Sequence, residues 1–321
     1  MGVNLYSFAY RHPRSALEFL EYCHSLGAGG LQTELESFEA VYINRLARRS
    51  EELGMYLEII SGLPGADAGK FELTLKAAKQ AGALCLRSAC LSGRRYETFA
   101  SLEDWKKFVA DSKAKIARAL PVLEKYRMPM GIENHKDWTA EEQVVLLREH
   151  SSEYLGVCLD TGNNIALLDD PYESFELLAP YAVCTHIKDM AVNECADGFL
   201  LSEVPLGAGV LDMQRIVHMI AKARPPTRFT LEMITRDPLR VPCLGEKYWV
   251  TFPKRSGVHL ARTLTMVRGN KPRAPLPSPE KLDHKARLSL EEDNVKRCLA
   301  YARESLGLRA ASAVSPPRSD R

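Results

Sequence analysis

The chain has 321 residues, of which 45% are hydrophobic and 26% charged, a balance typical of a globular protein with a large core. The formal net charge is only +2 and no long block of like charge occurs, so the composition gives no reason to expect a nucleic-acid or membrane partner. No run of about 18 apolar residues could span a membrane, and the first residues do not resemble a signal peptide, so we expect a cytoplasmic protein.

The eight cysteines are scattered singly along the chain, and no Cys-x-x-Cys pair occurs. Structural zinc sites and disulfide frameworks need cysteines at defined spacings. We therefore expect the thiols to be reduced and to act as small core residues, as is usual in a reducing compartment.

Short apolar segments alternate with amphipathic helical patterns from the first residues to about residue 233. The chain begins with a predicted strand at Val3–Phe8 and a helix at Ser15–Leu26, which Gly27 ends. The next predicted strand–helix pairs are Gly30–Leu35 and Ala40–Leu53, Tyr56–Ser61 and Phe71–Ala81, Leu84–Ala89 and Leu102–Tyr126, Met130–Asn134 and Thr139–His150, Leu155–Leu159 and Pro171–Leu178, and Ala182–Ile187 and Asp212–Ala223. Gly54 ends the second helix, and Thr139 with Glu142 predicts a capping box. Arg228–Met233 is the eighth predicted strand, and a predicted loop at Ala191–Gly209 lengthens the unit before it.

Eight strands that alternate with helices imply parallel strands joined by right-handed crossovers. A doubly wound open sheet could hold the same elements, but no glycine-rich phosphate turn opens the first unit. Polar residues also stand at the ends of several different strands, which is typical of a closed barrel. We predict a (β/α)8 TIM barrel over residues 1–235.

The rest of the chain is predicted to be a C-terminal extension. Residues 236–308 are expected to form an arm and a helix that pack on the barrel, and residues 309–321 a disordered tail with few apolar side chains. The segment Thr235–Arg255 is rich in proline and aromatic residues and should cross the barrel mouth. A final helix is predicted at Leu288–Leu306, with Ser289 and Glu292 as its capping box. A homodimer formed through this helix is left open.

Four polar residues stand at or just beyond the ends of the last four predicted strands: Glu133, Asp160, His186 and Glu232. Strands that follow one another in a barrel are neighbours, and their carboxyl ends meet on one face. The sequence therefore brings three carboxylates and one imidazole to a common point. A single acid at a strand end is more often a loop residue or a helix cap, and Asp160 before Thr161-Gly162 could be one. Four such residues on four consecutive strands argue against that alternative.

Three carboxylates in one pocket would repel each other unless a cation lies among them. Oxygen ligands with one nitrogen suit Mn²⁺, Mg²⁺ or Co²⁺ better than structural Zn²⁺. Four protein ligands leave positions for two oxygens of a hydroxy-ketone, whose carbonyl the ion would polarise while an enolate forms. We therefore predict a divalent metal cofactor and a small-molecule substrate.

Several motifs surround these residues: GIENHKD with Glu133, LDTGN with Asp160, HIKD with His186, PLGAG at 205–209 and LE at 231–232. With them the chain resembles the xylose isomerase-like TIM-barrel superfamily over about residues 1–235. The resemblance implies that the four positions bind Mn²⁺, Mg²⁺ or Co²⁺. It also implies that Glu133 and Glu232 act as the acid and base that move a proton across an enediolate.

The chain departs from the pattern of the ketose epimerases in that superfamily. Asn163 stands where they usually have a histidine, Val192 where they have an arginine, and Thr139 where they have a glutamate. The helpers of an ordinary epimerase are thus largely absent.

Two other residues lie beside the ligands instead. Strand alternation puts His135 on the face of Glu133, where it could be a general acid or base, or simply a histidine that is hydrogen-bonded in the loop. Lys188 could bind a substrate carboxylate or stabilise an enolate; the alternative is an ion pair with Asp189 or another carboxylate. We name Glu133, Glu232, His135 and Lys188 as the candidate catalytic residues.

An enolate can form by breaking either a C–H bond or a C–C bond. Isomerases break C–H and need two placed bases, whereas a β-keto acid decarboxylase needs one acid to protonate the carbanion. The missing helpers favour decarboxylation of a 3-oxo sugar acid. The stretches ENHKDW and DPLRVPCLGEKYW also resemble the 3-oxo-isoapionate decarboxylase group. The alternatives are an isomerase or epimerase of a small ketose or hydroxypyruvate-like substrate and, in another class, a metal-free sugar-binding protein.

Overall fold

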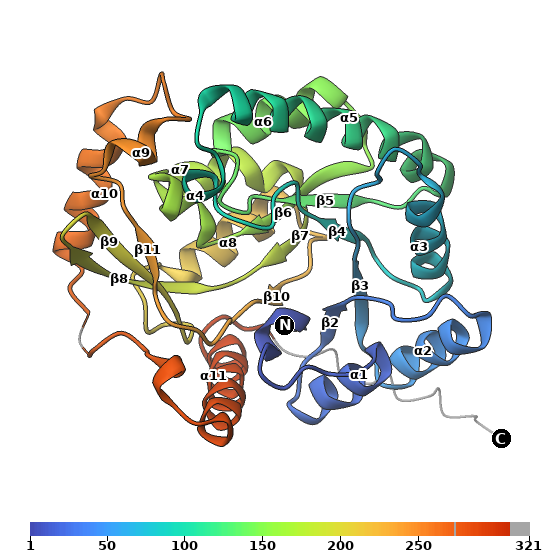
Figure 1. Ribbon diagram of the computed structural model, residues 1–321. Helices are drawn as coiled ribbons and strands as arrows, with labels where there is room; N and C mark the ends of the chain where they lie inside the picture. The colour runs from blue at the N-terminus through green and yellow to red at the C-terminus, as the bar shows by residue number, and fades with distance from the viewer. Residues whose placement is uncertain (273, 309–321) are drawn as a thin grey trace.

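Eight parallel strands form the centre of the molecule in a computed structural model that describes residues 1–272 and 274–308 (Figure 1). The strands are β1 (Gly2–Asn4), β2 (Gly30–Thr33), β3 (Tyr56–Ile60), β4 (Leu86–Ser88), β5 (Met130–Glu133), β6 (Leu155–Asp160), β7 (Ala182–His186) and β10 (Thr230–Leu231). Their order is β10-β1-β2-β3-β4-β5-β6-β7. β7 and β10 approach through a parallel bridge between Ile187 and Leu231, where the Ile187 N–H donates to Thr230 O at 2.8 Å. The predicted (β/α)8 barrel is confirmed.

Helices lie around the outside of this sheet and connect its strands (Figure 1). They are α1 (Ala16–Ser25), α2 (Ala40–Glu52), α3 (Gly69–Gln80), α4 (Arg95–Thr98), α5 (Leu102–Tyr126), α6 (Ala140–His150), α7 (Pro171–Leu178) and α8 (Met213–Ala223), with 3-10 turns η1 (Leu5–Phe8), η2 (Asn163–Leu167) and η3 (Ala179–Tyr181). Gly27 and Gly54 follow their helices with φ of +79° and +63°, as a left-handed end requires. Thr139 and Glu142 form the predicted capping box on α6.

The first strand is shorter than predicted. β1 ends at Asn4, and the residues expected to continue it form η1. The Asn4 side chain accepts a hydrogen bond from the Tyr6 N–H at 2.7 Å, which turns the chain out of the sheet. This leaves the Asn4 amide group inside the barrel.

An antiparallel sheet with the order β11-β9-β8 adjoins the barrel (Figure 1). β8 (Asp189–Cys195) and β9 (Gly198–Val204) form a hairpin, and β11 (Leu239–Val241) adds to its edge. The sequence predicted a loop from residue 191 to 209, and that prediction is wrong. Val192 and Leu201 are partners across the hairpin and are fully buried, so the apolar residues there belong to a strand pair.

The C-terminal extension contains α9 (Glu246–Trp249), α10 (Gly257–Gly269), the turn η4 (Pro279–Lys281) and α11 (His284–Glu304). α10 was not predicted. α11 begins before the predicted start, because the Asp283 side chain caps it by accepting from the Ala286 N–H at 2.8 Å. Ser289 therefore lies inside the helix, and its predicted capping box is wrong.

Hydrogen bonds hold the extension against the barrel at several places, among them the following. The Arg95 guanidinium after β4 donates to Thr251 O at 2.7 Å, and the Glu291 carboxylate on α11 accepts from the Tyr10 and Arg11 N–H groups at 2.7 and 3.1 Å. The division at residue 235 stays a prediction, and the predicted tail at 309–321 lies outside the described residues.

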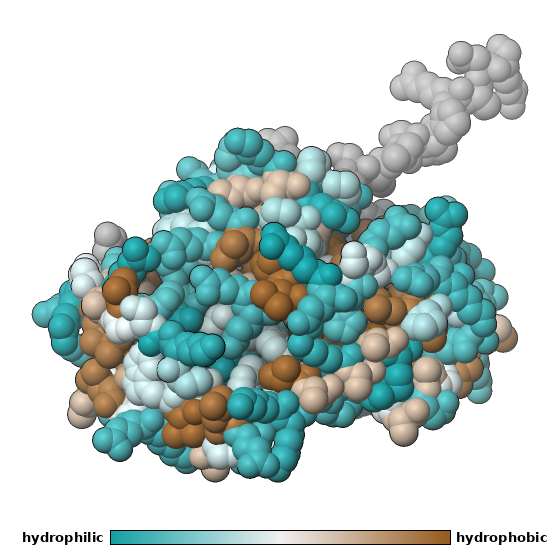
Figure 2. All heavy atoms as spheres, turned by 90° about the horizontal axis from the view of Figure 1, so that it is seen from above, coloured by the Kyte–Doolittle hydropathy of each residue, from teal (hydrophilic) through white to brown (hydrophobic). Residues whose placement is uncertain are grey.

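Within residues 1–272 and 274–308, no helix combines the length and the apolar character that crossing a membrane requires. The face shown in Figure 2 is mainly hydrophilic, and its apolar residues gather in several separate patches. Nothing on that face identifies a dimer contact, so the homodimer stays a prediction.

Candidate active site

The four predicted ligands come together at one end of the barrel. Glu133, Asp160 and His186 are the last residues of β5, β6 and β7, and Glu232 follows β10 directly. All four are buried, and one ligand atom from each lies within 4.8 Å of the others. His186 Nδ1 is 3.4 Å from Glu133 Oε1, 3.8 Å from Asp160 Oδ2 and 3.2 Å from Glu232 Oε1. The sequence prediction that these side chains share one point is confirmed.

A chain of buried amides and carboxylates fixes the orientation of His186. Its Nε2 lies 2.6 Å from Gln32 Oε1, which also accepts from Asn4 Nδ2 at 2.6 Å. Gln32 Nε2 in turn donates to Glu58 Oε2 at 2.9 Å. Asn4 Nδ2 also lies 3.0 Å from His186 Nε2, but its N–H can donate to Gln32 Oε1, whereas Gln32 Oε1 can only accept. A proton on His186 Nε2 satisfies this arrangement and leaves Nδ1 with a lone pair that faces the carboxylates.

The donor set fits a divalent cation. Among the described residues, His186 Nδ1 is a buried atom with no hydrogen-bond partner, although three carboxylates surround it. A proton on Nδ1 would also satisfy this centre: burial opposes it, but Cys158 and Glu232 raise the pKa of His186. Protons and metal ions would therefore compete for one position, which is usual for an imidazole ligand.

Two cations lie between these carboxylates. Arg87 on β4 donates through Nη2 to Glu133 Oε2, and Lys188 Nζ lies 2.9 Å from Asp160 Oδ2 and 2.5 Å from Glu232 Oε2. Lys188 also approaches Glu203 Oε1 at 3.4 Å. Burial lowers the pKa of Lys188, but these carboxylates outweigh that effect and raise it overall.

Lys188 thus has the ion pairs that the sequence considered as an alternative, but with site carboxylates and not with Asp189. Asp189 instead accepts from the N–H groups of Gly207, Gly209 and Leu211 at 2.9 to 3.2 Å. Its carboxylate holds the PLGAG turn, which explains why HIKD and PLGAG occur together.

His135 lies outside the regular strand. β5 ends at Glu133, so the alternation that placed His135 beside the ligand does not extend to it. Its Nδ1 lies 2.9 Å from Leu91 O, which is the loop hydrogen bond of the alternative interpretation. Burial lowers the pKa of His135 well below its usual value, so the ring is neutral near pH 7. Its catalytic role stays a prediction.

Besides Glu203, four further polar residues lie at the site without a role from sequence reasoning: Gln32, Glu58, Arg87 and Asn163. Asn163, noted only as a departure, donates through Nδ2 to Glu133 Oε1 at 2.9 Å. The other three interrupt apolar strands, as in YLEII and LRS. A polar side chain inside a barrel strand is the signal that could have identified them.

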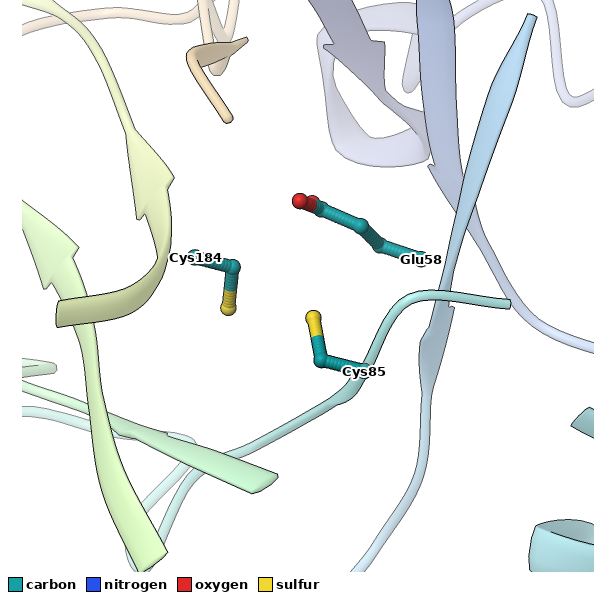
Figure 3. Close-up of side chains that lie close together, drawn as sticks. All are labelled: Glu58, Cys85 and Cys184. Atoms are coloured by element: carbon teal, nitrogen blue, oxygen red, sulfur yellow. The ribbon is translucent and has the colours of Figure 1, made fainter. Parts of the chain in front are cut away.

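A second group of possible ligands lies deeper in the barrel. Glu58, Cys85 and Cys184 point toward one another from β3, the segment before β4, and β7 (Figure 3). Burial raises the pKa of the Cys184 thiol well above its usual value. A metal needs thiolates, so this group fits a metal less well than the four predicted ligands do.

Residues 20–250 match the family described as the xylose isomerase-like TIM barrel. The chain belongs to that family. The match covers most of the barrel together with the hairpin and β11, and it confirms the family that the motifs resembled.

One relative and two solved structures illustrate what the chain is similar to. A 3-oxo-isoapionate decarboxylase from Pectobacterium atrosepticum is 28% identical over 232 residues, which are 68% of this chain and 80% of the relative. A D-psicose 3-epimerase from Clostridium cellulolyticum, solved with D-tagatose, superposes with a TM-score of 0.62 at 17% identity and covers 95% of this chain and 98% of its own. The protein IolI, solved with a bound zinc atom, superposes with a TM-score of 0.55 at 15% identity and covers 84% and 98%. At these identities the two structures show the fold alone.

Proposed function

We propose that the family member described here is a divalent-metal-dependent decarboxylase that acts on a 3-oxo sugar acid. The charge of the pocket carries this proposal. Contacts at the site join four carboxylates, of Glu133, Asp160, Glu203 and Glu232, to the side chains of Arg87, Lys188, Arg236 and, through Asn163, Lys136.

These carboxylates and cations balance one another before any metal is added. A divalent ion then leaves the pocket with excess positive charge, even if one lysine is neutral. Buried charge without a counter-charge is strongly unfavourable. An anionic substrate removes the excess, whereas a neutral ketose does not.

One relative supports an acid substrate. The curated relative is named for the decarboxylation of a sugar acid. Asn163, which stands where ketose epimerases usually have a histidine, donates to the ligand Glu133 and so has a structural task of its own.

Decarboxylation would use these groups as follows. When bound by Glu133, Asp160, His186 and Glu232, a divalent ion supplies Lewis acidity to the carbonyl and hydroxyl oxygens of the substrate. The bond between the carboxylate carbon and its neighbour breaks, CO2 leaves, and the electron pair remains as an enolate. Lys188, which its carboxylate partners keep protonated, gives one proton to that carbon.

An isomerase or epimerase is the second candidate. Glu133 Oε1 and Glu232 Oε1 lie 3.4 and 3.2 Å from His186 Nδ1 and could act as the two bases. His135 is neutral and could accept a proton in that reaction but not supply one. The similarity to the D-psicose 3-epimerase fold keeps this alternative in place. The third candidate is a metal-free sugar-binding protein. That function does not explain why His186 Nδ1 is directed, without a hydrogen-bond partner, at three carboxylates.

One experiment separates the three candidates. The Mn²⁺-loaded protein is incubated in D2O with 3-oxo-isoapionate and, separately, with D-fructose and D-psicose. We expect CO2 release from the acid and no exchange of carbon-bound hydrogen in either ketose. Glu232→Gln should lower CO2 release at least a hundredfold, because it removes a ligand. Exchange in the ketoses without CO2 release would establish the isomerase, and a protein that takes up no metal and turns over nothing would establish the binding protein.

A further inference from the structure

Lys136 is a buried lysine in an unusual backbone conformation. It is 3% exposed, and its φ of +62° lies in the left-handed region, which a side chain with a Cβ rarely adopts. The Arg95 N–H donates to its carbonyl at 3.0 Å and helps hold this turn. The turn directs this long cationic side chain inward, toward the site, whereas the side chain of a loop lysine ordinarily extends into water.

The ammonium group of Lys136 has too few partners. A lysine Nζ carries three N–H donors, and within the described chain this one donates to a single acceptor, Asn163 Oδ1, with no carboxylate in contact. Lys188, by comparison, has three carboxylates within 3.4 Å. The donors of Lys188 are thus taken, and those of Lys136 are free for a ligand.

The charges that face Lys136 come from four neighbouring segments. Lys188 and Arg236 are the cations, and Asp160 and Glu203 the carboxylates, whose charges act most strongly on Lys136. The two carboxylates are already bound to Lys188, and Glu203 also accepts from Arg236 at 2.7 Å. Burial first, and these cations second, lower the pKa of Lys136 to about 7.

We infer that Lys136 is the subsite for the carboxylate of the substrate, with Arg236 beside it. The inference rests on the proposed acid substrate and gives that carboxylate a location. A substrate carboxylate would supply the two acceptors that the ammonium lacks. Bound there, it would lie next to Asn163, whose amide donates to the ligand Glu133. The carboxylate then lies on the Lys136 side of the pocket, while the hydroxy-ketone oxygens face the four ligands.

Binding of two small probes tests this location. Glycerate is an inert hydroxy acid, and dihydroxyacetone is a neutral hydroxy-ketone of the same length. Calorimetric titration of the Mn²⁺-loaded protein measures the dissociation constant of each probe from pH 6 to pH 8. Because the carboxylate needs the protonated lysine, the dissociation constant of glycerate should rise roughly tenfold over this range, and that of dihydroxyacetone should not change.

Two variants complete the test. Lys136→Arg keeps a permanent charge, so glycerate should bind with no pH dependence between pH 6 and 8. Lys136→Gln should weaken glycerate at pH 6 roughly tenfold and leave dihydroxyacetone unchanged. Thermal melting of both variants checks that the fold is intact.

The outcomes separate this inference from the proposed function. A Lys136→Gln protein that is folded and binds glycerate as the wild type does would overturn the subsite alone, provided the wild type releases CO2 from the 3-oxo acid. A wild-type protein that binds dihydroxyacetone and not glycerate would overturn the acid substrate and the subsite together.

Discussion

The single residue whose surroundings say most about the site is His186. Its Nε2 proton is directed at Gln32, and Gln32 is held in turn by Glu58, whose carboxylate also accepts from the Thr230 hydroxyl at 3.0 Å. This series of hydrogen bonds favours the tautomer that leaves Nδ1 of His186 free. Metal-binding histidines generally depend on such a partner for the second nitrogen.

Replacement of Gln32 should therefore weaken metal binding without touching a ligand. In Gln32→Leu the His186 ring loses the acceptor that fixes it, and we expect Mn²⁺ affinity to fall about 10- to 100-fold. A titration of the metal-free protein with Mn²⁺, followed by electron paramagnetic resonance of the free ion, measures this. Gln143→Leu is the matched control, since Gln143 is equally buried but donates to Ile132 O; equal losses in the two variants would refute the role of Gln32.

The sequence predicted the four ligands because each depends on only one fact, its position at a strand end. To predict Asp160 and His186 as ligands, the β/α alternation was sufficient, and the direction of their side chains was not needed. Lys136 and Arg87 could not be placed in this way. The first reaches the site through a left-handed turn, and the second through the inward face of a strand only three residues long.

Among the elements, α11 shows how a C-terminal helix can stabilise the start of a barrel. The Glu291 carboxylate accepts two backbone N–H groups in the turn after η1, at Tyr10 and Arg11. Neighbouring Glu292 pairs with the Arg11 side chain at 2.8 Å. The helix thus satisfies backbone donors that the first β/α loop leaves open.

Glu291→Ala should destabilise the protein by about 1 to 2 kcal/mol, because two partly buried N–H groups, of Tyr10 and Arg11, lose their acceptor. Urea unfolding gives the change in the free energy of unfolding. Glu304→Ala, at an exposed position on the same helix, should change it by less than about 0.5 kcal/mol. A Glu291 variant as stable as the Glu304 variant would show that α11 does not support the loop.

The elements that the sequence missed have short or mixed patterns. The hairpin β8–β9 follows directly on the HIKD motif, and its apolar residues stand in short consecutive runs and do not alternate, so the segment was interpreted as a lengthened loop. α10 carries few buried side chains: Thr263, Leu264 and Val267. A helix with so narrow an apolar face is hard to distinguish from a loop by periodicity.

For the molecule as a whole, the polar layer inside the barrel makes stability depend on pH. Burial raises the pKa of Glu58 from 4.5 to about 7. The folded state therefore binds this proton more tightly than the unfolded state does. The stabilising contribution is complete below about pH 4.5 and is lost as the pH rises through 7.

The metal-free protein should accordingly lose up to about 3 kcal/mol of unfolding free energy from this group between pH 5 and pH 7.5. In Glu58→Gln the side chain is neutral throughout, so the decline should become shallower. Burial also raises the pKa values of Asp137 and Asp189 to about 6. Their contributions to the free energy of unfolding should decline equally in both proteins. Urea unfolding with EDTA present measures the slopes; identical slopes would mean that Glu58 does not titrate in this range.

The closure of the barrel also bears on how the chain is made. β10 is two residues long, lies between β1 and β7, and comes 226 residues after the end of β1, counting from Asn4 to Thr230. Until it leaves the ribosome, β1 and β7 both present unpaired backbone groups, and such edges pair readily with other chains. The longest-lived hazard in the synthesis of this protein is therefore the interval before Thr230 and Leu231 emerge, when the barrel is complete in every strand except the one that joins its ends.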